Sequence, residues 1–215
     1  MTALSEKLEH YVNTFMPTIH GWCDPFKARD IIKTVLEDKP VISVEIGVFA
    51  GRSLFAVGAA LEEIGANGQV YGIDPWSSEA CGQGYEKDDP NKEWWDSVNM
   101  GAIERSVYDV RSYLNLTHRV QLLKAKAVSA YPRFQEWHKK DSPIDFLHID
   151  GNHSEETSSA DVELYLPLVR SGATVFMDDT NWESTKKAQR MLLEFCEEPR
   201  IEESESHCYG VYKKK

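Results

Sequence analysis

Acidic residues stand directly after several apolar runs of this chain. Asp74 follows the run 69–73, Asp150 follows 144–149, and Asp178 and Asp179 follow 173–177. If these runs are parallel strands, their carboxyl ends share one sheet edge, which is where ligands bind in open α/β folds. Three carboxylates on two adjacent strands repel one another unless a cation neutralises them, and Mg²⁺ prefers such oxygen ligands. The alternative is that Asp179 caps the next helix while Asp178 faces solvent.

A second pattern joins a strand to a helix through two glycines. The apolar run 41–46 contains Glu45, the turn contains Gly47 and Gly51, and apolar residues recur at helical spacing from Leu54 onward. The free backbone N–H groups at such a helix start, with the positive end of the helix dipole, form an anion site. Asp74, at the end of the next strand, is placed to hydrogen-bond a ribose.

The glycine turn disfavours a dinucleotide. The pyrophosphate-binding pattern needs a middle glycine, but Phe49 occupies that position and no third glycine follows. An adenosyl ligand that carries a carboxylate suits the turn better, and a dinucleotide-dependent oxidoreductase is the lesser alternative.

The segment Glu45-Ile-Gly-x-x-x-Gly51, together with Asp74, resembles the cofactor motif of class I S-adenosylmethionine-dependent methyltransferases. The likeness extends from about residue 41 to the end. The later acids resemble those of the metal-dependent O-methyltransferases of the catechol and macrocin types, and the pair Asp178-Asp179 is closer to the macrocin type. The resemblance implies that S-adenosyl-L-methionine is the cofactor and that Mg²⁺ assists the methyl transfer.

The resemblance also assigns residues. Gly47, Gly51 and Ser53 would hold the methionine end, Glu45 would support the loop, and Trp76 would pack on adenine unless it belongs to the core. The expected cofactor contacts are Glu45, Gly47, Phe49, Gly51, Ser53, Asp74, Trp76, Ala127 and Asp150, and the expected metal ligands are Asp150, Asp178 and Asp179. Lys126, beside Ala127, departs from the acid or glycine usual in the family.

His153 is the expected catalytic base. The catechol type has a lysine three residues after its first metal ligand, and His153 stands at that distance from Asp150. The acid that the macrocin type places two residues after that ligand is replaced by Asn152, which cannot accept a proton in this way. A histidine with a pKa near 6.5 suits a base at neutral pH. The alternative is a helix-start histidine that interacts with Glu156.

Strands that alternate with helices position these groups. The pattern predicts a Rossmann-like, doubly wound, mostly parallel seven-stranded sheet with an antiparallel final strand, in one domain over 1–215. Helices over 3–16 and 25–39 precede the first strand, and the segment 1–39 is expected to form a lid over the cofactor.

The segment 77–99 has no regular pattern and is rich in Gly, Ser, Asp and Trp, so it is predicted to be a substrate-facing insertion. Its tryptophans would wall the pocket, or else begin the next helix and pack inward. The residues expected to face the acceptor are His20, Trp22, Trp94, Trp95 and Trp182.

Composition limits the partners. With 24 Lys and Arg against 35 Asp and Glu, the net charge of -11 disfavours nucleic acid and anionic membranes. Four scattered cysteines and a charged N-terminal stretch predict a cytoplasmic protein. The expected function is O-methylation of a hydroxyl on a small molecule or sugar, with help from the metal. A metal-independent methyltransferase acting on oxygen or nitrogen is the alternative. A homodimer is expected only because homodimers are common in the family that the chain resembles.

Overall fold

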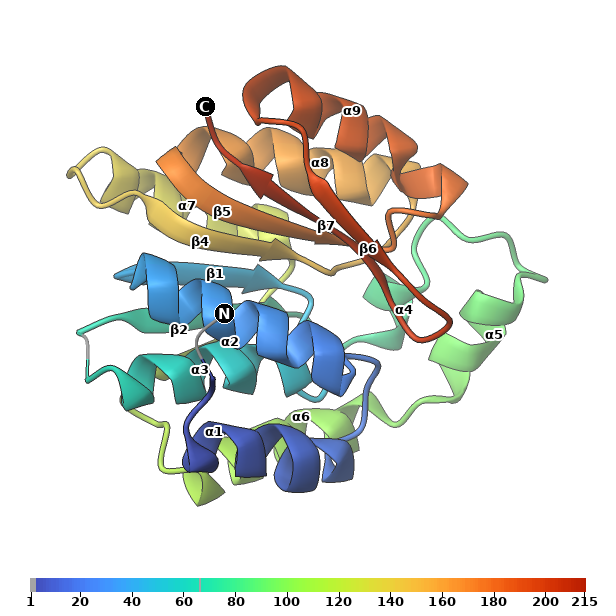
Figure 1. Cartoon of the computed structure of the whole chain (residues 1–215). Coiled ribbons are helices and arrows are strands. Elements are labelled where there is room, and N and C mark those ends of the chain that lie inside the picture. Colours follow the sequence, from blue (N-terminus) through green and yellow to red (C-terminus); the bar gives the residue numbers. More distant parts are fainter. Residues whose placement is uncertain (1–2, 66) are drawn as a thin grey trace.

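One seven-stranded sheet lies at the centre of the computed structural model, which describes residues 3–65 and 67–215 (Figure 1). The strand order is β3-β2-β1-β4-β5-β7-β6. The first five of these are parallel neighbours, whereas β7 runs antiparallel to both β5 and β6. The predicted fold class is confirmed. The strands are β1 (Ile42–Ile46), β2 (Gln69–Asp74), β3 (Val120–Lys124), β4 (Ile144–Ile149), β5 (Val169–Asp178), β6 (Arg200–Glu203) and β7 (Cys208–Lys213).

Helices cover both faces of the sheet because successive strand residues point to opposite sides. Phe146 belongs to the core on one face and its neighbour Leu147 to the core on the other. The first face is covered by α1 (Glu6–His10), α2 (Pro25–Asp38), α3 (Arg52–Glu63) and α6 (Met100–Tyr113), and the second by α7 (Ala127–His138), α8 (Glu155–Tyr165) and α9 (Lys186–Phe195) (Figure 1). Among the described residues, no helix is long and apolar enough to cross a bilayer.

The N-terminal segment is mainly a layer of the fold. Asp24 caps α2 by accepting a hydrogen bond from the Lys27 backbone N–H at 2.8 Å. Further along α2, Ile31 and Val35 are completely buried in the core that α2 shares with α3. Of its residues that the structure describes, those that line the ligand cavity lie in the loop before α2 and in the first turn of α2.

The segment 77–99 is more regular than its composition indicates. It contains two short helices, α4 (Ser78–Cys81) and α5 (Pro90–Ser97), each begun by a capping side chain. Ser77 accepts a hydrogen bond from the backbone of Ala80, and Asp89 accepts one from the backbone of Asn91. Helices this short show too few repeats for a sequence pattern to reveal them.

Gly47 allows the ends of β1 and β4 to meet. Its φ of 86° is in the left-handed region, and a Cβ atom there would lie 2.0 Å from the carbonyl oxygen of Asp150. The Asp150 backbone N–H in turn donates to the Ile46 carbonyl at 2.8 Å. The backbone of the glycine loop therefore passes directly over the backbone that carries Asp150.

We predict that Gly47→Ala lowers the free energy of unfolding by at least about 3 kcal/mol, because the methyl group meets a backbone atom that cannot move aside. Urea denaturation followed by circular dichroism measures the change. Gly172→Ala is the matched control. Its φ is 77° and its new Cβ atom would approach only the Arg170 side chain, at 3.8 Å, so strain of about 1–2 kcal/mol is expected. Equal losses in both variants would contradict this account.

Candidate active site

A cavity of about 970 Å³ opens at the carboxyl ends of the central parallel strands. Its walls come from many parts of the chain. They include the loop before α2, the glycine loop after β1, the turns after β3, β4 and β5, the α4–α5 segment, α8, and the loop between β6 and β7. This is the sheet edge that the sequence predicts for the ligand site. The size suits a ligand as large as a nucleoside derivative together with a second small molecule.

The Asp74 carboxylate binds the backbone of the glycine loop. Its Oδ2 accepts hydrogen bonds from the N–H groups of Val48 and Phe49, both at 2.9 Å, and its Oδ1 accepts one from Trp76 at 2.6 Å. Burial raises the pKa of Asp74, and the three N–H donors offset only part of that rise. A carboxylate offers about four acceptor positions, so one remains for a ligand that enters the cavity.

Glu45 links the glycine loop to β4. This completely buried carboxylate accepts a hydrogen bond from the Ser53 hydroxyl at 3.0 Å, and its other oxygen lies 3.0 Å from Nδ1 of His148. Burial and the nearby Lys27 lower the pKa of His148, but the carboxylates of Asp178 and Glu45 outweigh them and raise it to about 9. His148 therefore lies between Glu45 and the acids at the ends of β4 and β5, where the net shift favours its charged form.

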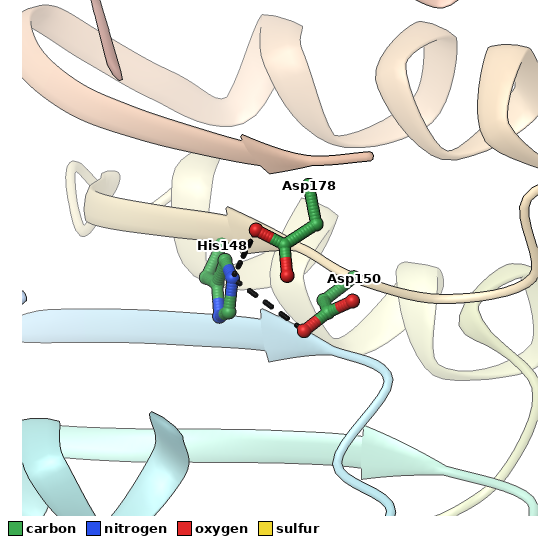
Figure 2. A group of neighbouring side chains, drawn as sticks. All are labelled: His148, Asp150 and Asp178. Carbon is green, nitrogen blue, oxygen red and sulfur yellow. Dashed lines mark ion pairs between the residues drawn. The ribbon is translucent and has the colours of Figure 1, made fainter. Parts of the chain in front are cut away.

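Figure 2 shows that His148 faces the carboxylates of Asp150 and Asp178. Its Nε2 lies 3.8 Å from Asp150 Oδ2 and 3.7 Å from Asp178 Oδ1. These residues come from the end of β4, the residue after it, and the end of β5. We call them the inner cluster.

Lys27 supplies the cation of the inner cluster. Its ammonium Nζ, on the first turn of α2, forms ion pairs with Asp178 and, at 3.4 Å, with Asp150 Oδ2. The lysine side chain is only 3% exposed. Burial raises the pKa of Asp178, but Lys27 and His148 outweigh it and lower that pKa well below its ordinary value. Burial and the charge of Asp178 raise the pKa of Asp150, so Lys27 and His148 mainly compensate Asp178.

The three carboxylates expected to bind a metal do not form one group. Among the described residues, the clusters with ligand atoms in mutual reach are His148, Asp150, Asp178 and, separately, Asp150, His153, Asp179. The backbone explains the division, because Asp179 adopts a positive φ of 49° and turns away from Asp178. We call the second group the outer cluster; it shares Asp150 with the inner one.

His153 and Asp179 form a pair in the outer cluster. Their Nε2 and Oδ2 atoms are 2.9 Å apart. Burial lowers the pKa of His153, whereas the hydrogen bond with Asp179 and the surrounding carboxylates raise it, and the net shift is upward. The ring of Trp182 lies beside the imidazole, with centroids 5.2 Å apart. Among the described residues, the ion-pair partner of His153 is Asp179 and not Glu156, the alternative partner.

Five rings form what we call the aromatic wall: His20, Trp22, Phe49, Trp94 and Trp95. Trp22 lies 5.0 Å from Trp94 and 5.1 Å from Phe49 between centroids, and Trp94 lies 4.7 Å from Trp95. All five line the cavity, as Trp182 does. The loop that carries His20 and Trp22 is held by Arg52, which donates to the carbonyls of Pro17, Ile19 and Cys23.

Trp76 is the expected site residue that the structure places elsewhere. It is 5% exposed, belongs to the core, and donates from Nε1 to the Phe49 carbonyl at 2.8 Å. A positive φ of 43° at this residue directs the ring inward. Trp76 therefore matches the alternative of a core residue, and it is not among the residues that line the cavity. Ala127, by contrast, lines the cavity.

Three features of the site are not predicted by the sequence pattern. The pattern does not single out Lys27, although it stands on the buried helical face, four residues before Ile31. The Asn152 amide donates to carbonyls of the α4 segment, the shortest contact being 2.6 Å to Cys81. The loop between β6 and β7 contacts the Asp24 carboxylate through His207, at 2.7 Å. The last two are long-range contacts that no local pattern encodes.

The fold is that of class I S-adenosylmethionine-dependent methyltransferases. A family model described as a methyltransferase domain matches residues 44–180, and the chain belongs to that family.

Solved structures with the same fold are distant in sequence. The O-methyltransferase TomG from Streptomyces achromogenes, in complex with S-adenosylmethionine, aligns with a TM-score of 0.64 and 13% identity over 100% of this chain and 92% of that one. An O-methyltransferase from Bacillus cereus, in complex with S-adenosylhomocysteine, aligns with a TM-score of 0.62 and 17% identity over 100% and 93%. The Podospora anserina methyltransferase PaMTH1 aligns with a TM-score of 0.60 and 12% identity over 99% and 89%.

The place of Trp76 in the core can be tested by unfolding. Trp76→Phe removes the partner of the Phe49 carbonyl, and we expect it to lower the unfolding free energy by about 1–3 kcal/mol. In Trp22→Phe, where the residue is 60% exposed, a change within about 0.5 kcal/mol is expected. Urea denaturation followed by far-UV circular dichroism avoids relying on tryptophan emission. A loss confined to Trp22→Phe would contradict the core assignment.

Proposed function

We propose that this chain transfers the methyl group of S-adenosyl-L-methionine to a hydroxyl oxygen of a small molecule or sugar. One observation carries the proposal: a single cavity is lined both by the glycine loop with Asp74 and by the His153–Asp179 pair. The first group suits an adenosyl ligand, and the second suits proton removal from an acceptor. Joined in one cavity, they allow both reactants to meet.

The cofactor side of the cavity is proposed to work through backbone and carboxylate groups. The glycine loop ends at the N-terminus of α3, where free N–H groups favour the carboxylate of the methionine part. The remaining acceptor position of Asp74 faces the cavity and suits a ribose hydroxyl. Ala127, after β3, offers an apolar surface for the adenine. When bound, the cofactor supplies an electrophilic methyl group on a sulfonium.

His153 is proposed to take the acceptor's proton. Its Nε2 is held by Asp179, so its Nδ1 is the nitrogen left to accept a proton, as in other histidine–aspartate pairs. The acceptor oxygen forms a bond to the methyl carbon while the carbon–sulfur bond breaks. The hydroxyl proton passes to His153, and S-adenosylhomocysteine and the methyl ether are the products. The charge on Asp179 stabilises the imidazolium that forms.

The acceptor is proposed to lie against the aromatic wall. Flat rings and the apolar faces of sugars both pack on tryptophan. Trp22, Trp94 and Trp95 offer such surfaces close to the glycine loop. A sugar hydroxyl and a small phenol are both compatible with this wall, and the acid pair Asp178-Asp179, which resembles the macrocin type, favours the sugar.

The residues of the inner cluster do not fit a divalent metal. A dication within about 4 Å of the Lys27 ammonium would be repelled by about 8 kcal/mol at an effective dielectric constant of about 20. The outer cluster offers Asp150, His153 and Asp179, but a metal there would occupy the proposed base. The proposal therefore uses no metal. Loss of activity in EDTA and its recovery with Mg²⁺ would instead favour the outer cluster as a metal site.

We predict that calorimetry will detect S-adenosylhomocysteine binding by the wild type and that Asp74→Asn will weaken it at least about tenfold. The amide places an NH₂ group against backbone N–H donors and disturbs the loop. Glu156→Gln removes the same charge from an exposed position at the cavity, and its affinity should match the wild type. Absence of binding by the wild type would overturn the proposed function.

His153→Ala should reduce methyl transfer by about 10²-fold or more because the acceptor loses its base. The assay is release of S-adenosylhomocysteine with a panel of sugar and phenol acceptors. Affinity for S-adenosylhomocysteine should stay within about threefold of the wild type. His138→Ala, an exposed histidine on α7, is the control and should keep full turnover. Full turnover in His153→Ala would refute its role as the base.

A further inference from the structure

We propose that Lys27 is the resident cation of the inner cluster, so that its ammonium takes the place that a divalent metal would need between Asp150 and Asp178. Methyl transfer would then proceed without an added metal. The statement about turnover rests on the proposed function, whereas the statement about metal binding does not.

The position of Lys27 is built into the fold. The lysine is nearly fully buried, and its Nζ contacts carboxylates that stand 123 and 151 residues further along the chain. The Tyr209 ring lies 5.9 Å from the same Nζ, on the side of β7. The ammonium is thus surrounded by groups from the turn after β4, from β5 and from β7 that favour a cation.

The backbone that carries Lys27 is fixed as well. Asp24 caps the first turn of α2 through the Lys27 N–H. The same carboxylate accepts a hydrogen bond from Ser206 at 2.5 Å and lies 2.7 Å from His207, both in the loop between β6 and β7. Lysine in the first turn of a helix faces the positive end of the helix dipole, which is unfavourable unless acids lie nearby. Here Asp150 and Asp178 meet that condition.

Lys27 and a metal compete for the same oxygens. A hard dication binds carboxylate oxygens at about 2.0–2.6 Å, and Lys27 already forms ion pairs with Oδ2 of Asp150 and Oδ2 of Asp178. His148 lies on the other side of the two carboxylates, with its Nε2 3.8 Å from Asp150 Oδ2 and 3.7 Å from Asp178 Oδ1. Replacing the ammonium by a neutral group would remove the ion-pair partner of two partly buried carboxylates, whose oxygens are the ligands that a hard dication prefers.

The experiment measures Mn²⁺ binding by electron paramagnetic resonance, in which free Mn²⁺ gives the signal and bound Mn²⁺ does not. We expect Lys27→Met to bind Mn²⁺ at least about tenfold more tightly than the wild type. Lys33→Met, on the same helix and with the same loss of charge, should behave as the wild type. Stoichiometric Mn²⁺ binding by the wild type that Asp178→Asn abolishes would overturn the proposal.

One further variant and one further measurement keep the test decisive if Lys27→Met folds poorly. Lys27→Met combined with Asp178→Asn removes one charge of each sign; it should fold, bind S-adenosylhomocysteine and gain no Mn²⁺ site. Tight Mn²⁺ binding by this double variant would contradict competition for Asp178. Wild-type turnover should be unchanged by EDTA. A wild type that fails to bind S-adenosylhomocysteine would refute the methyltransferase function and leave the Mn²⁺ result standing.

Discussion

Negative charge at one edge of the sheet is the constraint on which the rest of the structure depends. Parallel strands deliver their last side chains to the same edge, so acids after β2, β4 and β5 crowd together. Each is compensated differently. Asp74 receives backbone N–H groups, Asp178 receives a lysine ammonium, and Asp179 pairs with His153. The loop after β1, the first turn of α2 and the turn after β4 are therefore held by the acids they neutralise.

These compensating groups also connect the two halves of the cavity. A chain of polar contacts runs from Ser53 at the start of α3 through Glu45 and His148 to Asp178. All but the last of these residues are buried, so the contacts operate in a medium where charges interact strongly. A displacement of the glycine loop would therefore move the acids as well. One network positions both the glycine loop, where the cofactor is proposed to bind, and the acids near the proposed acceptor.

Local patterns in the sequence predict the strands, the order of alternation and the acids at strand ends, because each depends on neighbours a few residues apart. Lys27 depends on partners more than 120 residues away, and a pattern shows only that a lysine interrupts an apolar face. Trp76 and Asp179 could not be placed either. Both adopt a positive φ that non-glycine residues seldom take, and this reverses the side to which the side chain points.

The turn at Asp179 separates the inner cluster from the outer cluster at one edge of the sheet. On the inner side, Lys27 forms ion pairs with Asp178 and Asp150, and His148 lies close to both acids in a largely buried setting. On the outer side, His153 and Asp179 are partly exposed to the cavity, where an acceptor can reach them. Asp150 contacts both groups. The inner acids already have Lys27 as their partner. In the proposed reaction, a proton that passes to His153 therefore adds positive charge only beside Asp179, which can stabilise it.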